Sequence, residues 1–351
     1  MHSARPAGIL IAAGLLFAQP NPPETLLRVE CVCPIVMKGG AGPTVVYSLR
    51  NDGTHPRTFA KNGWRWFVAD GSASQLTVTV PSTFRSVVAR SRLDIDIRNL
   101  NASVEAETIG GRIFMDTIGG DTAARTGGGE IKIGRVKGNL RATSAGNGIS
   151  VGQVDGDVWC ETSGGEVVVE RAGGAIHAVT GGGNVYIGEG GSSVSAKSDG
   201  GLIDVQHAAG MVDAETRGGS IQVGGAKGAR CESAAGAIRI RNLSGALNVR
   251  TALGSILTEL LAGVPFEQSS LVTGQGDITV LIPSNLAVSI EAINESRGRM
   301  ARIVSDFPQF RVTTVNSGPA PAMWAEGSLN GGGPMLRINA ASGTIYLRRQ
   351  R

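Results

Sequence analysis

The chain has 351 residues with a formal charge of +4, and it combines 52 glycines and 41% hydrophobic residues with only 4% aromatic residues. Glycine is about twice its ordinary usage of ~7% while proline is not enriched, which excludes a collagen-like chain, and the apolar content excludes a disordered linker. The basic residues are scattered, without a run longer than Arg348–Arg349, so the sequence predicts no nucleic-acid partner.

Residues 1–18 have the features of a secretory signal peptide. Arg5 precedes an apolar run from Ile9 to Phe17, and Ala18 is the expected cleavage point. The run is far shorter than the ~20 residues that span a bilayer. A buried segment of the fold is the alternative. No later apolar run is long enough to span, so we expect an exported protein without a transmembrane segment, in the periplasm, at the cell surface or outside the cell.

Residues 19–90 are weakly periodic, and the stretches PTVVYSLRN, WRWFVA and SQLTVTVP predict a β-rich N-terminal segment or cap. Cys31 and Cys33 would lie on one face of a strand, at a spacing awkward for a mutual bond. A C-x-C pair without a second pair of Cys or His is weak evidence for a metal. The sequence therefore predicts no metal site and no cofactor.

An 18-residue repeat begins at about residue 91 and occurs nine times in full. Its rule is T-x-G-G-x-I-x-V-x-x-V-x-G-x-V-x-A-x, in which a hydroxyl residue is followed by glycine and two pairs of apolar residues. Successive hydroxyls are 18 positions apart, with one gap of 17. They are Thr108, Thr126, Ser144, Thr162, Thr180, Ser198, Thr216, Ser233 and Thr251.

An apolar pair at period two between glycine turns indicates a short strand with one buried face. Two such strands per coil predict an all-β fold, a parallel β-solenoid (β-helix) with coils of about 18 residues, expected to be right-handed. The solenoid domain would span residues 91–351. Terminal coils need covering, so we expect irregular caps at both ends, the C-terminal one formed by residues 291–325.

The glycines do not predict a nucleotide site, because a phosphate-binding loop opens a helix and no helical pattern follows any of them. A calcium-binding roll needs a recurring Asp, whereas the corresponding slots hold Ile131, Ile149, Val167 and Val185. We interpret the recurring hydroxyls as structural. Cys160 and Cys231 occupy the inward slot that alanine holds elsewhere, four coils apart, which predicts two buried free thiols.

Outward positions are the best candidates for function. On the second strand of each coil, Arg141, Trp159 and His177 fall in one column, and Glu161 falls in the next. An exposed Trp beside charged groups could stack on a sugar ring or bind a protein partner. A mixed, solvated surface with a single exposed Trp is the alternative. No carboxylate pair with the spacing of a glycosidase stands out, so we predict no catalytic residues.

Residues 76–349 resemble the bacterial "putative adhesin" domain family of unknown function. The resemblance rests on the coil motif VKGNLRATSAGNGISV and its copies, and on the ending GSLNGGGPMLRINAASGTIYLRR. It implies a β-helix in an exported or envelope protein and brings no catalytic residue with it.

The leading hypothesis is an exported, non-enzymatic β-solenoid that acts as an adhesin or cell-envelope scaffold, with an envelope glycan or a surface protein as partner. A polysaccharide-processing β-helix enzyme, either lyase or hydrolase, is the first alternative. A self-assembling structural protein that stacks end to end is the second, although capped ends would oppose such stacking.

Overall fold

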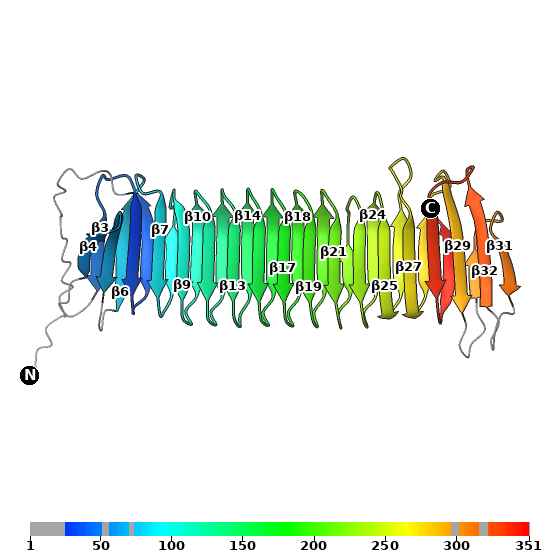
Figure 1. Ribbon diagram of the computed structural model, residues 1–351, viewed down its shortest axis with the longest axis horizontal. Coiled ribbons are helices and arrows are strands. Elements are labelled where there is room, and N and C mark those ends of the chain that lie inside the picture. The colour runs from blue at the N-terminus through cyan, green and yellow to red at the C-terminus, as the bar shows by residue number, and fades with distance from the viewer. Residues whose placement is uncertain (1–24, 51–55, 70–73, 296–301, 316–321, 351) are drawn as a thin grey trace, which may run out of the picture. The chain divides into compact units, whose positions relative to one another are not determined.

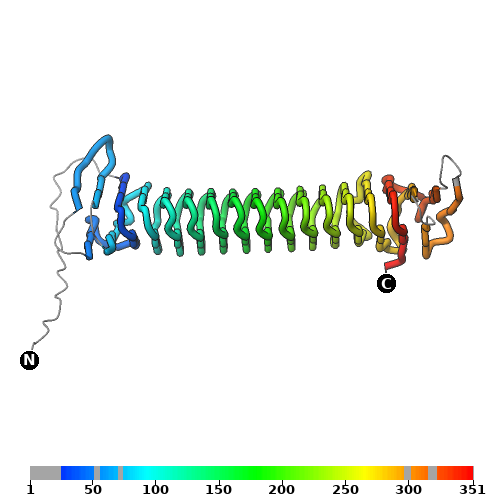
Figure 2. Tube along the Cα trace, turned by 90° about the horizontal axis from the view of Figure 1, so that it is seen from below, coloured from blue at the N-terminus to red at the C-terminus, as the bar shows by residue number. Residues whose placement is uncertain are grey.

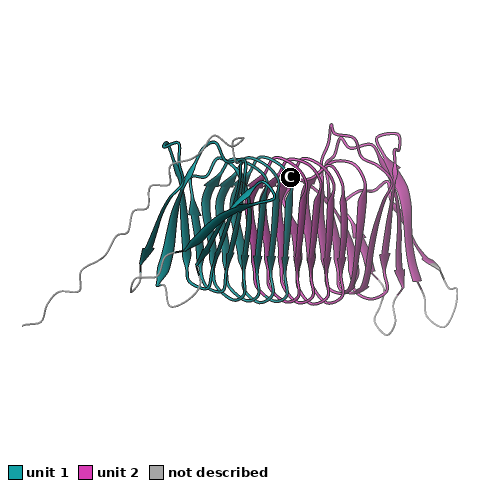
Figure 3. Cartoon of the chain, turned by 60° about the vertical axis from the view of Figure 1, so that its left-hand side comes forward, with its two compact units in different colours: residues 1–164 teal, residues 165–351 magenta. Residues whose placement is uncertain are grey.

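The computed structural model describes residues 25–50, 56–69, 74–295, 302–315 and 322–350, and within these ranges all regular structure is β-strand. The predicted signal peptide lies outside them. The chain divides into two compact units, Met1–Gly164 and Gly165–Arg351 (Figure 3). Within each unit, A strands end at the repeated hydroxyl, B strands follow the glycine turn, and the strands of each kind lie side by side (Figure 1).

Unit 1 contains both kinds of strand in parallel stacks. The A strands are β5 (Trp64–Ala69), β1 (Leu26–Cys31), β7 (Ser86–Ser91), β9 (Ser103–Thr108), β11 (Thr122–Thr126), β13 (Leu140–Ser144) and β15 (Val158–Thr162), in this spatial order. The B strands are β6 (Gln75–Pro81), β2 (Ile35–Gly40), β8 (Ile95–Arg98), β10 (Ile113–Ile118), β12 (Ile131–Val136) and β14 (Ile149–Val154).

Unit 2 has the same arrangement. Its A strands are β17 (Ile176–Thr180), β19 (Val194–Ser198), β21 (Val212–Thr216), β23 (Ala229–Ser233), β25 (Leu247–Leu253), β27 (Ser269–Gln275), β33 (Met335–Ala340) and β29 (Val288–Glu295). Its B strands are β16 (Val167–Ala172), β18 (Val185–Gly190), β20 (Ile203–Ala208), β22 (Ile221–Val223), β24 (Ile238–Leu243), β26 (Ile256–Leu260), β28 (Ile278–Ile282), β34 (Thr344–Arg349) and β30 (Arg302–Ser305).

The predicted parallel β-solenoid is confirmed, with successive coils visible in each unit (Figure 2). Residues 18 positions apart are in register, as for Ile131 and Ile149 on the B strands and Ala124 and Ala142 on the A strands. Branched residues fill the B side of the core and mostly small residues fill the A side. The interior of each coil is therefore narrow, and its inward side chains are buried. The right-handed winding stays a prediction.

The antiparallel strands lie outside the 18-residue repeat, although other strands there still stack in parallel, as β1 does with β5 and β29 does with β33. In unit 1, β4 (Arg57–Lys61) runs antiparallel to β5, and β3 (Val46–Arg50) runs antiparallel to β6. In unit 2, β32 (Ala322–Leu329) runs antiparallel to β29 and to β31 (Arg311–Val315). The described residues of the predicted caps therefore form strands as well as loops. The predicted domain boundary at residue 91 stays a prediction, although β1 and β2 already pair with coil strands.

The repeated hydroxyls connect each coil to the one before it. The Thr126 hydroxyl donates to the Gly111 carbonyl oxygen at 2.8 Å and accepts the Gly129 N–H at 2.9 Å. The same donation to the preceding coil's turn is made by Thr108, Ser144, Thr162, Thr180, Ser198, Thr216, Ser233 and Thr251. These hydroxyls are buried, which confirms that their repetition is structural.

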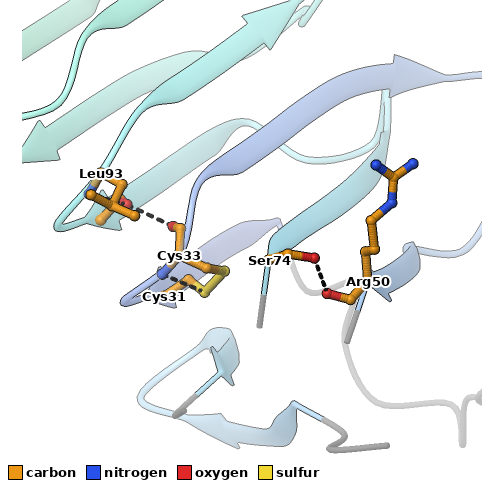
Figure 4. Close-up of a disulfide and its surroundings, with 6 residues drawn as sticks. Cys31, Cys33, Arg50, Ser74 and Leu93 are labelled. Carbon is orange, nitrogen blue, oxygen red and sulfur yellow. Dashed lines mark hydrogen bonds between the residues drawn. A yellow bond between two sulfur atoms is a disulfide. The ribbon is translucent and has the colours of Figure 1, made fainter. Parts of the chain in front are cut away.

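The expectation for Cys31 and Cys33 is wrong, because the two residues form a disulfide with Cα atoms 5.1 Å apart (Figure 4). Strand β1 ends at Cys31, so Cys33 lies in the bend that follows and not on the strand. Cys31 pairs in register with Ser91, at the slot that hydroxyls occupy in later coils. The Cys33 N–H donates to the Cys31 sulfur at 3.1 Å, as the Leu93 N–H donates to the Ser91 hydroxyl at 2.9 Å.

We expect Thr126→Val to lower the free energy of unfolding by about 1–3 kcal/mol, because it leaves a buried carbonyl and a buried N–H without their partner. Thr117→Val is the matched control, since Thr117 is half-buried on β10 and its hydroxyl makes no hydrogen bond among the described residues. Urea unfolding of both variants measures the difference. Equal stability of the two variants would contradict the role of the hydroxyl.

Two adjacent glycines in the same turn should differ in tolerance. A Cβ at Gly129 would overlap the Gly111 carbonyl oxygen of the preceding coil, whereas a Cβ at Gly128 meets nothing within 4 Å. Gly129→Ala should therefore destabilise unit 1 by about 1–3 kcal/mol, as overpacking does. Gly128→Ala should stay within about 0.5 kcal/mol of the parent. Thermal unfolding compares the pair, and similar shifts in both would show that coil contact does not fix the glycine.

Candidate functional site

The outer face of the A strands in unit 1 carries two columns of residues, set by the parallel register. The first column consists of Arg28, Val88, Glu105, Ala123, Arg141 and Trp159. The second consists of Glu30, Arg90, Glu107, Arg125, Thr143 and Glu161. Side chains in one column follow one another from strand to strand at about 4.8 Å. The columns thus place Arg141 directly beside Trp159, and Thr143 beside Glu161.

A groove of about 360 Å³ lies on this face. Its lining residues come from four neighbouring A strands and are Arg90, Glu105, Ala106, Glu107, Ala123, Ala124, Arg125, Arg141 and Thr143. The depression follows from one short side chain, because Ala123 stands in the first column between Glu105 and Arg141. We call these nine residues the A-face groove.

The charges in the A-face groove are unevenly paired. Arg90 contacts both acids, with guanidinium nitrogens 3.4 Å from Glu105 Oε1 and 3.1 Å from Glu107 Oε2. Within the described part of the chain, Arg125 and Arg141 form no ion pair. Three arginines and two glutamates give the groove a formal charge of +1. The guanidinium groups of Arg125 and Arg141 are thus available for a ligand. The two carboxylates instead contact Arg90.

Trp159 already has a partner on this face. The Arg141 guanidinium carbon lies 5.0 Å from the centre of the Trp159 ring, and such a contact is worth about 0.5–1 kcal/mol at an exposed site. Trp159 is 39% exposed. The ring therefore holds Arg141 in place at the border of the A-face groove, in addition to presenting apolar surface to solvent.

The four predicted patch residues fall in different parts of the chain. Arg141, Trp159 and Glu161 belong to unit 1, where β13 and β15 bring them together. His177 belongs to unit 2, where it is half-buried on β17 and in register with Ser195. That His177 joins the patch stays a prediction.

A second arginine–tryptophan pair on unit 1 was not predicted. The Arg28 guanidinium carbon lies 4.4 Å from the centre of the Trp66 ring, and the Phe59 ring stacks on Trp66 at 5.6 Å between centres. Arg28 also contacts the Glu30 carboxylate at 2.6 Å. The stretch WRWFVA indicated a strand here, but the pairing of β5 with β1 cannot be read from a segment without a repeat.

The A-face groove was missed for a related reason. Its position depends on an alanine among long side chains and on which carboxylate each arginine meets. The repeat gives the columns, so Ala123 beside Arg141 could have indicated a depression. The choice of Arg90 as partner for both Glu105 and Glu107 is a matter of side-chain conformation and gives no sequence signal.

The two predicted free thiols, Cys160 and Cys231, are confirmed as free and buried. Burial raises the pKa of each thiol to about 12, and for Cys231 the nearby Asp213 carboxylate adds to the increase. Both occupy inward core slots, so neither belongs to a surface site. In the described residues, no helix has the length and apolar character that crossing a membrane would need.

The likeness of this chain to known proteins is distant. No family model and no curated protein matches the chain. Among solved structures, a protein from Clostridium sporogenes described as a putative cell adhesion protein matches at 7% identity, with a TM-score of 0.16, over 97% of this chain and 100% of that one. A likeness at this level carries no functional argument, and membership of the adhesin family stays a prediction.

Native protein should not react with a thiol reagent at pH 8, because a thiol with a pKa of about 12 holds almost no thiolate there and both sulfurs are buried. In guanidinium chloride, two thiols per chain should react, and all four should react after reduction of the Cys31–Cys33 disulfide. Titration with Ellman's reagent measures each number. Rapid reaction of the native protein, or four reactive thiols before reduction, would contradict this assignment.

Proposed function

We propose that this protein is an exported, non-enzymatic β-solenoid that serves as an adhesin or binding scaffold in the cell envelope. Its partner would be an envelope glycan or a surface protein, met by the outer face of the A strands. The observation that carries this proposal is the A-face groove, whose guanidinium groups Arg125 and Arg141 have no carboxylate partner within the described residues and whose border is an exposed Trp159.

The solenoid supports a binding role through its rigidity. Each coil is bonded to the one before it through both strand ladders and through a buried hydroxyl, so outward side chains are held on regular elements. Binding surfaces that are already in place lose less conformational entropy when a partner arrives. The repeated hydroxyls form hydrogen bonds within the turns. This favours a structural role for them over a role as catalytic nucleophiles.

One observation favours an enzyme that processes polysaccharides as the second candidate. Glu105 and Glu107 both line the A-face groove, two positions apart on β9. Hydrolysis of a glycosidic bond uses a pair of carboxylates. Both carboxylates contact Arg90, however, so neither stands apart from a protein partner as an unengaged catalytic group would. A binding site for a glycan is therefore the proposal, and cleavage is an outcome that its test can detect.

End-to-end assembly is disfavoured by an edge strand of unit 1. The antiparallel strand β4 presents Arg57 and Lys61 where unit 1 ends its A stack. Charged residues on an edge strand discourage pairing with another chain.

Trp159→Ala should weaken binding to an envelope glycan or surface protein by about tenfold, equivalent to ~1.4 kcal/mol, because it removes exposed ring surface and releases Arg141. Phe114→Ala is the matched control, since Arg98 lies 5.4 Å from the Phe114 ring on the B face of the same unit. Binding to a glycan array and to isolated envelopes measures the effect.

Three results would contradict the proposal. Binding that is equal in the parent and in Trp159→Ala would exclude the patch, and loss of binding in Phe114→Ala alone would place the site on the B face. Release of shortened glycans in the same assay would make the protein an enzyme. Circular dichroism of each variant separates loss of binding from loss of folding.

A further inference from the structure

We infer that the A-face groove is a subsite for a sugar acid, with the carboxylate of a uronic acid unit bound between Arg125 and Arg141. This inference rests on the proposed binding function and specifies the chemistry of the glycan. The structure offers three independent supports, which are the unpaired arginines, the paired carboxylates and the dimensions of the groove.

The two arginines are placed to share one anion. Arg141 is in register with Ala123, and Arg125 lies two positions after Ala123 on the same strand, so the arginines are diagonal neighbours on β11 and β13. Diagonal residues of adjacent strands are about 7–8 Å apart at the backbone, within reach of long side chains. A guanidinium group binds a carboxylate through two parallel N–H donors. The ring of Trp159 limits the motion of Arg141 and reduces the entropy lost on binding.

The acids of the groove complete a site for sugar hydroxyls. Glu105 and Glu107 both lie beside the Arg90 guanidinium, and ionised carboxylates are strong hydrogen-bond acceptors. Thr143 adds a hydroxyl at the other side. A uronic acid carries one carboxylate and several hydroxyl donors, which matches two unpaired cations beside two acceptor groups. Glu105 and Glu107 would repel further anionic groups on the same sugar, so a sugar with a single carboxylate fits better than a densely sulfated one.

The groove has the size of a subsite and not of a complete polymer site. Its volume of about 360 Å³ is near the lower end of the ~300–1,000 Å³ typical of small-ligand pockets. Its nine lining residues come from β7, β9, β11 and β13, so a bound sugar would lie across several coils. A short stretch of an acidic glycan is therefore the expected occupant.

Calorimetric titration of the full chain with oligogalacturonate and with alginate oligomers tests the inference. Each acid oligomer is compared with its methyl ester, which keeps the sugar and removes the charge. At least one acid oligomer should bind, and its methyl ester should bind at least tenfold more weakly. Arg125→Gln and Arg141→Gln should each reduce affinity for the acid about tenfold. Arg135→Gln should leave it unchanged, because Arg135 lies on β12, 3.7 Å from Asp155, outside the groove.

The failures of this inference and of the proposed function are distinguishable. Equal affinity for acid and ester, lost in Trp159→Ala, would overturn the sugar-acid inference and leave the binding surface in place. Affinity for the acid that survives both arginine substitutions would put the site elsewhere. Equal or tighter binding of dextran sulfate would show a general polyanion surface. No binding to either acid oligomer, while a neutral glycan or envelope protein binds, overturns the inference alone, whereas no binding to any of these overturns both.

Discussion

The buried hydroxyl at the turn of each coil is the interaction on which the rest of the fold depends. Stacked coils bury the carbonyl and N–H groups of their turns, and an unsatisfied buried group of this kind costs about 1–3 kcal/mol. One side chain satisfies both, as Thr126 does by donating to Gly111 and accepting from Gly129. A Cβ at Gly129 would overlap the Gly111 carbonyl oxygen of the preceding coil, so this glycine and the hydroxyl before it let the two coils stack closely and in register.

A fixed register converts sequence position into surface position. Between β9 and β15, residues 18 positions apart occupy the same column, so the chemistry of a face is decided one residue at a time. The core slots tolerate little variation because they are completely buried, whereas the outward columns vary freely from coil to coil. A groove then needs no special loop. It needs one short residue, Ala123, between long neighbours on adjacent strands.

The sequence was sufficient for the features that the repeat encodes. The solenoid, its core, the buried thiols of Cys160 and Cys231, and the adjacency of Arg141 and Trp159 all follow from the 18-residue phase. The Cys31–Cys33 disulfide did not follow, because Cys31 is separated from its register partner Ser91 by an insertion that hides the phase. The partners of Arg90 could not be predicted either, since they depend on side-chain conformations and not on spacing.

The two arginine–tryptophan pairs of unit 1 show why the candidate site lies at one of them. Arg28 and Arg141 occupy the same column, and each lies over a Trp ring. Arg28 also contacts the Glu30 carboxylate at 2.6 Å, so its charge is already compensated. Arg141 has no carboxylate partner in the described ranges, although Glu161 lies on the neighbouring strand. A cation held by an aromatic ring keeps its N–H donors for an incoming anion, and only the pair with Trp159 meets that condition beside a groove.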